Sequence, residues 1–417
     1  MTLNMLADSG INSSMLKLQI ERSADQIESS TTELPTTNDA NKIDDDATSS
    51  FITDVNLISE RLEQARILEE ECKIFVAAGL LEGIDPKHFQ PIHRVIVKEA
   101  ELFRRLLHDS SSPITASKSD DDDNESSNEH TNSEEWIKQG EQHGERHNFA
   151  MYYKVSPTNQ ITCRLETPIE PQLLIPILAV LNESELYKTW IPQYKVPRLE
   201  VVKSEKLCQS GRVSQTILVE TEVPWPIAKR ELILKAVACD DIIDSEDNNG
   251  GSVNSNHDSN GGRRDSGGAS RILVRIQSLD CEDNGEDGLE ILPAKNGVRI
   301  KVDGGFVFEK CPADHPMANE KKSSSSDDDD RDADDNLILL TFTFSVDPKL
   351  SILPQSLLNF FLRTAMRQIW GMFLHVAEEV GDGKRPAHSD AIARKREALY
   401  DWVEERTSAM LQHSLSK

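Results

Sequence analysis

Apolar and polar residues alternate in most of the strand-like runs that follow residue 148. The clearest run is "ILLTFTFSV" at 338–346, where Phe342 and Phe344 fall on one face and Thr341 and Thr343 on the other. Strict alternation is typical of a β-strand with one face covered and one face in water. The pattern predicts an antiparallel sheet, with strands at 149–155, 161–169, 198–206, 212–223, 229–239, 271–280, 297–310 and 336–346.

Two segments before these strands repeat apolar residues every three or four positions, which is helical spacing. Their apolar stripes run over 58–75 and 89–106. Gly83 is suited to end the first helix, and Pro86 is suited to the first turn of the second. We therefore expect a helical hairpin at 51–108, with the two apolar faces in contact.

Three further segments have helical character. The run at 134–148 predicts a short helix, and 171–192 predicts a helix that breaks near Asn182. The longest is 353–380, about 26 helical residues, which at ~1.5 Å per residue span ~39 Å. Charged residues within it argue against a membrane span. Its apolar stripe consists of Leu358, Phe361, Leu362, Ala365, Ile369, Phe373, Val376 and Val380. The element order predicts an α+β fold, in which a curved antiparallel sheet wraps around this long C-terminal helix.

The net charge of −26 is concentrated in acidic runs. These lie at 120–125, 240–247, 280–290 and 327–335, and the rest of the chain is close to neutral. Such runs are typical of solvated segments without fixed structure. We divide the chain into a disordered N-terminus (1–50), the helical hairpin (51–108), an acidic disordered linker (109–132), a sheet domain (133–382) with disordered insertions at about 244–270 and 312–336, and a helical tail (383–417).

Several function classes are disfavoured by the sequence. Basic residues form no dominant patch, so a nucleic-acid partner is not expected. His143 and His147 have metal-like spacing, but Gly144 weakens a helix between them and no third ligand is nearby, so no metal is expected. No catalytic constellation stands out, and we expect neither an enzyme nor a cofactor. The scattered cysteines and the lack of a signal peptide predict a cytoplasmic protein.

Three stretches of the sequence, taken in chain order, resemble segments of a known protein family. They are "ELYKTWIPQY", "VPWPIAKRELIL" with its Arg230-Glu231 pair, and "LPQSLLNFFLRTAM". With the element order, they resemble the START (steroidogenic-acute-regulatory-protein-related lipid-transfer) domain of the helix-grip superfamily. The second stretch departs from the family pattern, since Arg-Asp is the usual pair at that position. The resemblance covers roughly residues 133–382 and leaves the hairpin and the tail unexplained.

The resemblance implies an apolar tunnel between the sheet and the C-terminal helix that holds one lipid, such as a sterol, a phospholipid or a sphingolipid. It also implies transient membrane contact, with the Trp225 loop at the tunnel mouth, where a tryptophan ring suits the headgroup region. The candidate lipid-binding residues are Trp225, Ile227, Arg230, Trp190, Phe306, Phe308, Phe342, Phe344, Leu358, Leu362, Ile369 and Phe373.

Each of these residues also has a purely structural interpretation. Trp225 can cap the sheet edge, Arg230 can form a surface ion pair, and Trp190 can anchor a helix. Phe342, Phe344, Ile369 and Phe373 belong to the core in any case, and only the cavity decides whether they also contact a ligand.

Two other functions stay open at this point. One is an adaptor or regulatory protein that binds a protein partner or dimerises through 51–108, with the sheet domain as a lipid sensor. The other is an enzyme on the same fold, such as a cyclase or hydrolase, which would need polar groups converging inside the tunnel.

Overall fold

The computed structural model describes residues 52–112, 136–143, 147–156, 160–195, 198–223, 228–242, 270–282, 289–294, 297–319, 337–347, 349 and 364–415. Within these ranges, one sheet contains β1 (Ile137–His143), β2 (Asn148–Val155), β3 (Ile161–Ile169), β4 (Tyr194–Lys195), β5 (Arg198–Gln209), β6 (Ser214–Glu222), β7 (Arg230–Asp241), β8 (Arg271–Ser278), β9 (Val298–Arg299), β10 (Lys301–Lys310) and β11 (Ile338–Asp347). The helices are α2 (Val55–Glu70), α3 (Ile74–Leu81), η1 (Pro86–His88), α4 (Pro91–Ser111), η2 (Pro171–Leu173), α5 (Leu174–Asn182), η3 (Ser184–Thr189), α6 (Pro316–Asn319), α8 (Met366–Gly381), α9 (Pro386–Arg394), the π-helical turn η9 (Arg396–Tyr400) and α10 (Asp401–Leu415).

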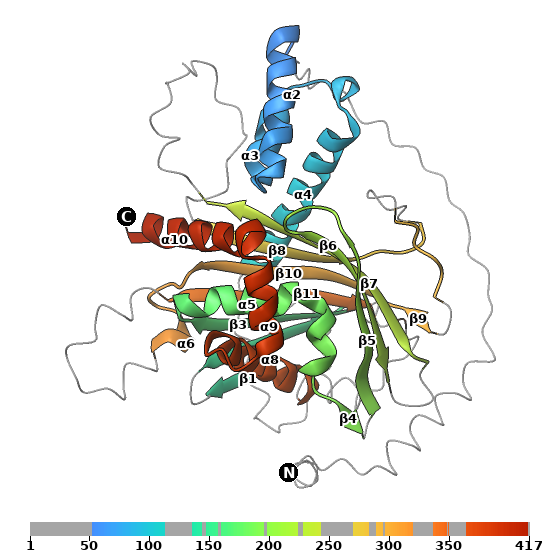
Figure 1. Cartoon of the computed structure of the whole chain (residues 1–417), viewed down its shortest axis with the longest axis vertical. Helices are drawn as coiled ribbons and strands as arrows, with labels where there is room; N and C mark the ends of the chain where they lie inside the picture. Colours follow the sequence, from blue (N-terminus) through green and yellow to red (C-terminus); the bar gives the residue numbers. More distant parts are fainter. Residues whose placement is uncertain are drawn as a thin grey trace, which may run out of the picture.

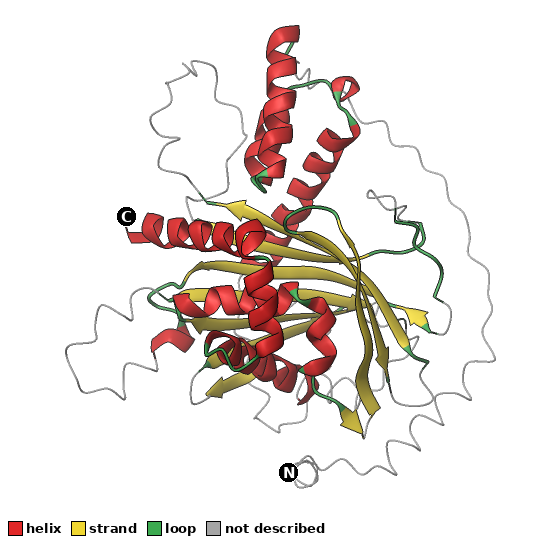
Figure 2. Cartoon of the chain, in the orientation of Figure 1, coloured by secondary structure: helices red, strands yellow, loops and turns green. Residues whose placement is uncertain are grey.

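The strands lie side by side in the order β1-β2-β3-β11-β10-β8-β7-β6-β5-β4, and each neighbouring pair is antiparallel. The short β9 pairs parallel to β7 at its beginning. Figures 1 and 2 show the sheet curving around helices α5, α8 and α9. The predicted fold class is therefore confirmed: a curved antiparallel sheet packs against a C-terminal helix.

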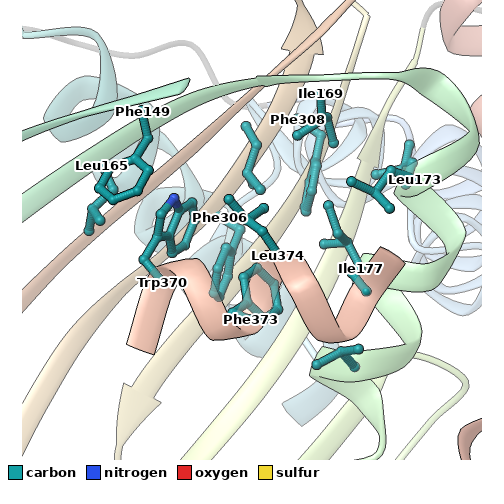
Figure 3. Close-up of a cluster of buried hydrophobic side chains, with 14 of the residues drawn as sticks. Phe149, Leu165, Ile169, Leu173, Ile177, Phe306, Phe308, Trp370, Phe373 and Leu374 are labelled. Atoms are coloured by element: carbon teal, nitrogen blue, oxygen red, sulfur yellow. The ribbon is translucent and has the colours of Figure 1, made fainter. Parts of the chain in front are cut away.

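The main core lies between the inner face of the sheet and helix α8. Figure 3 shows Trp370, Phe373 and Leu374 of α8 directed towards Phe306 and Phe308 of β10. The indole nitrogen of Trp370 donates a hydrogen bond of 2.9 Å to the buried hydroxyl of Thr167 in β3. Aromatic packing and this single buried hydrogen bond fix the rotation of α8 relative to the sheet.

Helices α3 and α4 pack against the outer face of the same sheet, and α2 packs against these two helices. The apolar stripe of α4, which includes Ile96, Phe103 and Leu106, packs against Leu273 of β8 and Val307 of β10. The predicted hairpin thus meets the sheet as well as itself. Because this stripe is buried in the fold, it is not available for dimerisation.

A glycine in β10 lets α4 approach the sheet closely. A Cβ at Gly305 would lie 2.9 Å from the Leu106 Cδ2 atom and 2.2 Å from the Val274 carbonyl oxygen. Real Cβ atoms essentially never approach other atoms that closely, so a side chain here would push α4 away or distort β8.

The structure corrects two local predictions. The short helix predicted at 134–148 is wrong, because Ile137–His143 forms strand β1 and pairs with β2. Gly140 disfavours a helix, and its φ of 142° leaves room for Arg367, which donates to the Gln139 carbonyl oxygen at 3.3 Å. Strand pairing therefore overrides a weak local helix signal here.

The predicted N-terminal hairpin also divides differently. The first helix ends at Glu70 and a second, α3, begins at Ile74, so the described part of this region holds three α-helices. Cys72 between them has a left-handed φ of 66°. Its carbonyl oxygen accepts a hydrogen bond of 2.9 Å from the Asp240 amide, which ties this break to the end of β7.

The C-terminal region of the structure is helical. Helix α8 ends at Gly381, close to the expected end, and its predicted beginning at 353–363 lies outside the described residues. Beyond it, α9, η9 and α10 return over the inner face and contact α5, α8 and strands β8 and β10. The tail is therefore part of the packed fold.

Candidate functional site

A cavity of about 260 Å³ lies between the inner face of the sheet, α5, η3, α8 and the C-terminal helices. One water molecule needs only about 10–15 Å³ of such space, so a much larger guest fits. Its lining consists of Leu178, Leu181, Asn182, Tyr187, Trp190, Ile191, Val213, Gln215, Ile217, Leu234, Ala236, Ala238, Cys239, Asp240, Ile272, Val274, Ile276, Phe306, Phe342, Met366, Ile369, Trp370, Phe373, Leu399, Tyr400, Trp402, Val403 and Arg406.

Alternation along two strands supplies the floor of this cavity. Leu234, Ala236 and Ala238 of β7 line it, and Ala238 lies opposite Val274 of β8 in the register. Successive side chains on a strand point to opposite faces, so these residues share the inner face. The two alanines are small, and they leave space that a larger side chain would fill.

Aromatic rings form the wall between η3 and α8. The ring centroids of Trp190 and Phe373 are 6.0 Å apart, and those of Phe342 and Trp370 are 5.8 Å apart with parallel planes. Phe306 lies 4.2 Å from Phe342, also stacked. Such packed rings make a rigid apolar surface that suits an apolar guest.

The polar lining residues gather where β6 begins and β7 ends. We call Asn182, Gln215, Asp240, Tyr400 and Arg406 the polar end of the cavity. The side-chain amide nitrogen of Gln215 donates to the Asn182 carbonyl oxygen at 3.2 Å. Arg406 donates through Nε to a carboxylate oxygen of Asp240, whose side chain is only 2% exposed.

One buried carboxylate, Glu183, holds the polar end to the C-terminal region. It accepts hydrogen bonds from Lys395 Nζ at 2.7 and 2.8 Å, from the Tyr400 hydroxyl at 3.1 Å and from Asn182 at 2.9 Å. Burial opposes ionisation of Glu183, but these hydrogen bonds outweigh burial and lower its pKa. The same surroundings raise the pKa of Tyr400, chiefly through burial, so its hydroxyl stays protonated and donates.

The candidate residues from the sequence differ in their position relative to the cavity. Trp190, Phe306, Phe342, Ile369 and Phe373 line the cavity. Phe308 and Phe344 are buried in the core beside it and are not among its lining residues. Trp225, Ile227, Leu358 and Leu362 lie outside the described residues.

Arg230 is also absent from the cavity lining. Its residue is 7% exposed, and Nη1 donates to the Ala228 carbonyl oxygen at 2.7 Å. Burial lowers the pKa of its guanidinium. It lies at the beginning of β7, whereas the polar end of the cavity meets the end of that strand.

The C-terminal wall of the cavity was not predicted from the sequence. Leu399, Tyr400, Trp402, Val403 and Arg406 all line it, although they follow the region that the family resemblance covers. A signal was present, because Leu399, Val403 and Met410 recur at near-helical spacing and are buried. The missing information was which surface this apolar stripe covers.

Other kinds of site have little support among the described residues. In that part of the chain, no group of three or more His, Cys, Asp or Glu side chains could hold a metal ion. His147 instead lies 2.8 Å from a carboxylate oxygen of Glu378. No helix in the described ranges is long and apolar enough to cross a membrane.

Comparisons with known proteins give similar structures but no sequence match. No protein-family model matches the chain, and no curated protein matches it. The STAR-related lipid transfer protein from Xanthomonas axonopodis is similar over 58% of this chain and 98% of its own, at 15% identity and a TM-score of 0.34. Human StAR-related lipid transfer protein 5 covers 59% of this chain and 87% of its own (12% identity, TM-score 0.36), and human STARD10 covers 65% and 81% (14%, 0.35). Similarity at this level assigns neither a ligand nor an activity to this chain.

Proposed function

We propose that this protein binds one lipid molecule in the cavity and carries it between membranes. The observation that carries the proposal is a cavity of about 260 Å³ whose walls are apolar except at one end. An apolar cavity left unfilled by side chains favours an apolar guest over water. The polar end suits a lipid whose apolar body carries one polar group.

The proposed mechanism makes and breaks no covalent bond. The lipid exchanges an apolar bilayer for an apolar cavity, so the two bound states are close in free energy. During the crossing, the walls shield methylene groups that would otherwise each cost ~0.8 kcal/mol in water. A sterol, a phospholipid and a sphingolipid all satisfy this requirement, and the shape of the cavity and its polar end select among them.

The adaptor alternative has weaker support. The apolar stripe of α4 is occupied by the sheet, and the exposed apolar side chains of the N-terminal helices, such as Val55, Ile67 and Val76, do not indicate what would cover them. Single exposed apolar residues are common on protein surfaces.

The proposal can be tested by filling the cavity. Ala236→Phe places a large ring on the cavity floor, in the space that the small alanine side chain leaves empty. We expect at least a tenfold loss of affinity for a fluorescent sterol or a fluorescent phospholipid, whichever the wild-type protein binds, with no loss of thermal stability. Titration with each labelled lipid measures the change.

The matched control is Ala313→Phe, which adds the same ring at an exposed position in the loop after β10. It should bind like the wild type. If Ala236→Phe is folded and binds labelled lipid as tightly as the control, the ligand does not occupy this cavity and the proposal is wrong.

A further inference from the structure

We infer that the C-terminal segment Pro386–Leu415 is a movable cover of the cavity and that the ligand enters and leaves beneath it. The inference rests on the proposed function, since a cover needs a guest. Five residues of this segment line the cavity, namely Leu399, Tyr400, Trp402, Val403 and Arg406. The segment is therefore a wall of the binding site as well as a tail.

The cover is joined to a firmly packed helix by a short connection. Helix α8 is fixed in the main core by Trp370, Phe373 and Val376, all of which are buried. Between α8 and α9, Gly383 has a left-handed φ of 70°, and a Cβ at this position would meet no atom within 4 Å. A glycine in open space has no side chain that limits its backbone angles, and opening here breaks the hydrogen bond of 3.0 Å from the Gly383 amide to the Val380 carbonyl oxygen, so this connection suits a hinge.

Polar contacts help to hold the cover in place, beside the buried apolar side chains of Leu399, Val403 and Met410. The Lys395 ammonium and the Tyr400 hydroxyl both donate to Glu183, and Arg406 pairs with Asp240. The Arg212 guanidinium lies 5.3 Å from the centroid of the Trp402 ring. When such contacts open, water can replace the lost hydrogen bonds, and the side chain of Lys395 is already 31% exposed.

The helical geometry of the cover is irregular where it meets the cavity. Arg396–Tyr400 forms a π-helical turn between α9 and α10. Turns of this kind are rare and occur frequently at functional sites. This turn places Leu399 and Tyr400 against the cavity and leaves Lys395, at its beginning, to reach Glu183.

The cavity lies closer to this cover than to Val223 and Ala228, the described residues that flank 224–227. The last described residues on either side of that segment, Val223 and Ala228, do not line the cavity. The nearest lining residues on the two strands are Ile217 and Leu234, which at ~3.3 Å per residue are ~20 Å from these ends. At the other end of β7, Asp240 touches the cover directly through Arg406.

The test removes the contact that lies outside the cavity lining. Lys395→Met removes the ammonium that binds Glu183, and Lys395→Arg keeps a positive charge there. The matched control is Lys203→Met in β5, because Lys203 pairs with Glu205 at 2.7 Å where both side chains are largely exposed (47% and 48%). Each variant is loaded with a fluorescent lipid and mixed with acceptor vesicles of neutral phospholipid, and the release rate is recorded. Hydrogen–deuterium exchange over 386–415 reports opening of the cover.

We expect Lys395→Met to release the lipid at least three times faster than the wild type and to exchange faster over 386–415. Lys395→Arg should return towards the wild-type rate, and Lys203→Met should stay within a factor of two of it. Thermal unfolding of each variant shows whether a faster release reflects global unfolding. Faster exchange with an unchanged release rate would overturn the inference, because the ligand would then leave elsewhere. A lipid release rate that changes in Trp225→Ala but not in Lys395→Met would also overturn the inference. The lipid would then pass near residue 225.

Failure of the proposed function gives a different result. If the wild type binds none of the labelled lipids, the lipid proposal fails, and exchange of the ligand-free variants still tests the cover. If hydrogen–deuterium exchange over 386–415 is then unchanged in Lys395→Met, the inference of a movable cover is wrong. Faster exchange confined to 386–415 would support it.

Discussion

Two neighbouring carboxylates at the end of β7 have opposite surroundings. Asp240 is paired with Arg406 and also accepts a hydrogen bond of 3.0 Å from the Ile242 amide. Burial raises the pKa of Asp241 to about 6, and the charge of Arg271, its partner in the β7–β8 register, only partly offsets this rise. At neutral pH, Asp241 therefore carries a charge in surroundings that disfavour it.

Asp241→Asn should stabilise the protein at neutral pH. The folded protein holds the Asp241 proton up to about pH 6, whereas the unfolded chain releases it near the ordinary value of 3.8. The wild type therefore loses stability as pH rises through this window, and the variant does not. We expect a gain of up to ~3 kcal/mol at pH 7 and none below about pH 4, measured by urea unfolding across pH.

The control is Asp280→Asn, because hydrogen bonds from the Cys281 amide and thiol lower the pKa of Asp280. Asp280→Asn should give no gain in the free energy of unfolding at pH 7. If Asp241→Asn has the same free energy of unfolding as the wild type at every pH, this account of Asp241 is wrong.

At the scale of elements, the N-terminal helices are tied to the sheet by a buried ion pair. Arg275 of β8 is 1% exposed and donates through Nη2 to Glu99 of α4 at 2.6 Å and through Nε at 3.1 Å. Lys235 of β7 lies 3.6 Å from the same carboxylate. The charges satisfy one another only when α4 is docked, so the pair fixes where the helix sits on the outer face.

Glu99→Ala should strongly destabilise the fold. It leaves the Arg275 guanidinium buried without its carboxylate, with a hydrogen bond of 2.9 Å to Gln277 and the Phe103 ring centroid 6.0 Å away. Breaking a buried pair in this way costs ~3–5 kcal/mol. Glu101→Ala is the control, since Glu101 forms an exposed pair with Arg105 at 3.2 Å, and it should cost less than ~1 kcal/mol. Equal unfolding free energies for the two variants would contradict this role of Glu99.

Prediction from the sequence worked best where a single element determines its own pattern. Alternation located the long strands, such as the one containing Phe342, because each has one buried face. It did not find β1, whose polar residues adopt a strand only because β2 is beside it. Helical spacing could not reveal the break at Cys72, which depends on a contact with Asp240.

The same limit applies to the candidate site. Residues such as Phe306 and Phe373 were found because any core on this face needs them. Ala236 and Ala238 matter because of the space they leave, and no residue pattern reports empty space. Arg406 reaches the cavity only through tertiary packing of α10, so the sequence alone gave no reason to select it.

At the scale of the whole molecule, both faces of the curved sheet are covered, but they are packed differently. On the outer face, α3 and α4 pack against the strands in a buried apolar cluster. The inner face meets α5, α8 and the C-terminal helices around a cavity of about 260 Å³. Empty volume of this size lowers stability unless something fills it, so a bound guest should stabilise the protein.

The most direct test of the central claim is native mass spectrometry of the full-length protein, followed by organic extraction and lipid analysis of the bound material. We expect one added mass per chain that matches a single lipid class, lost in Ala236→Phe and kept in Ala313→Phe. A bare protein that also takes up no fluorescent sterol or phospholipid would contradict the account and would show that the cavity holds no lipid.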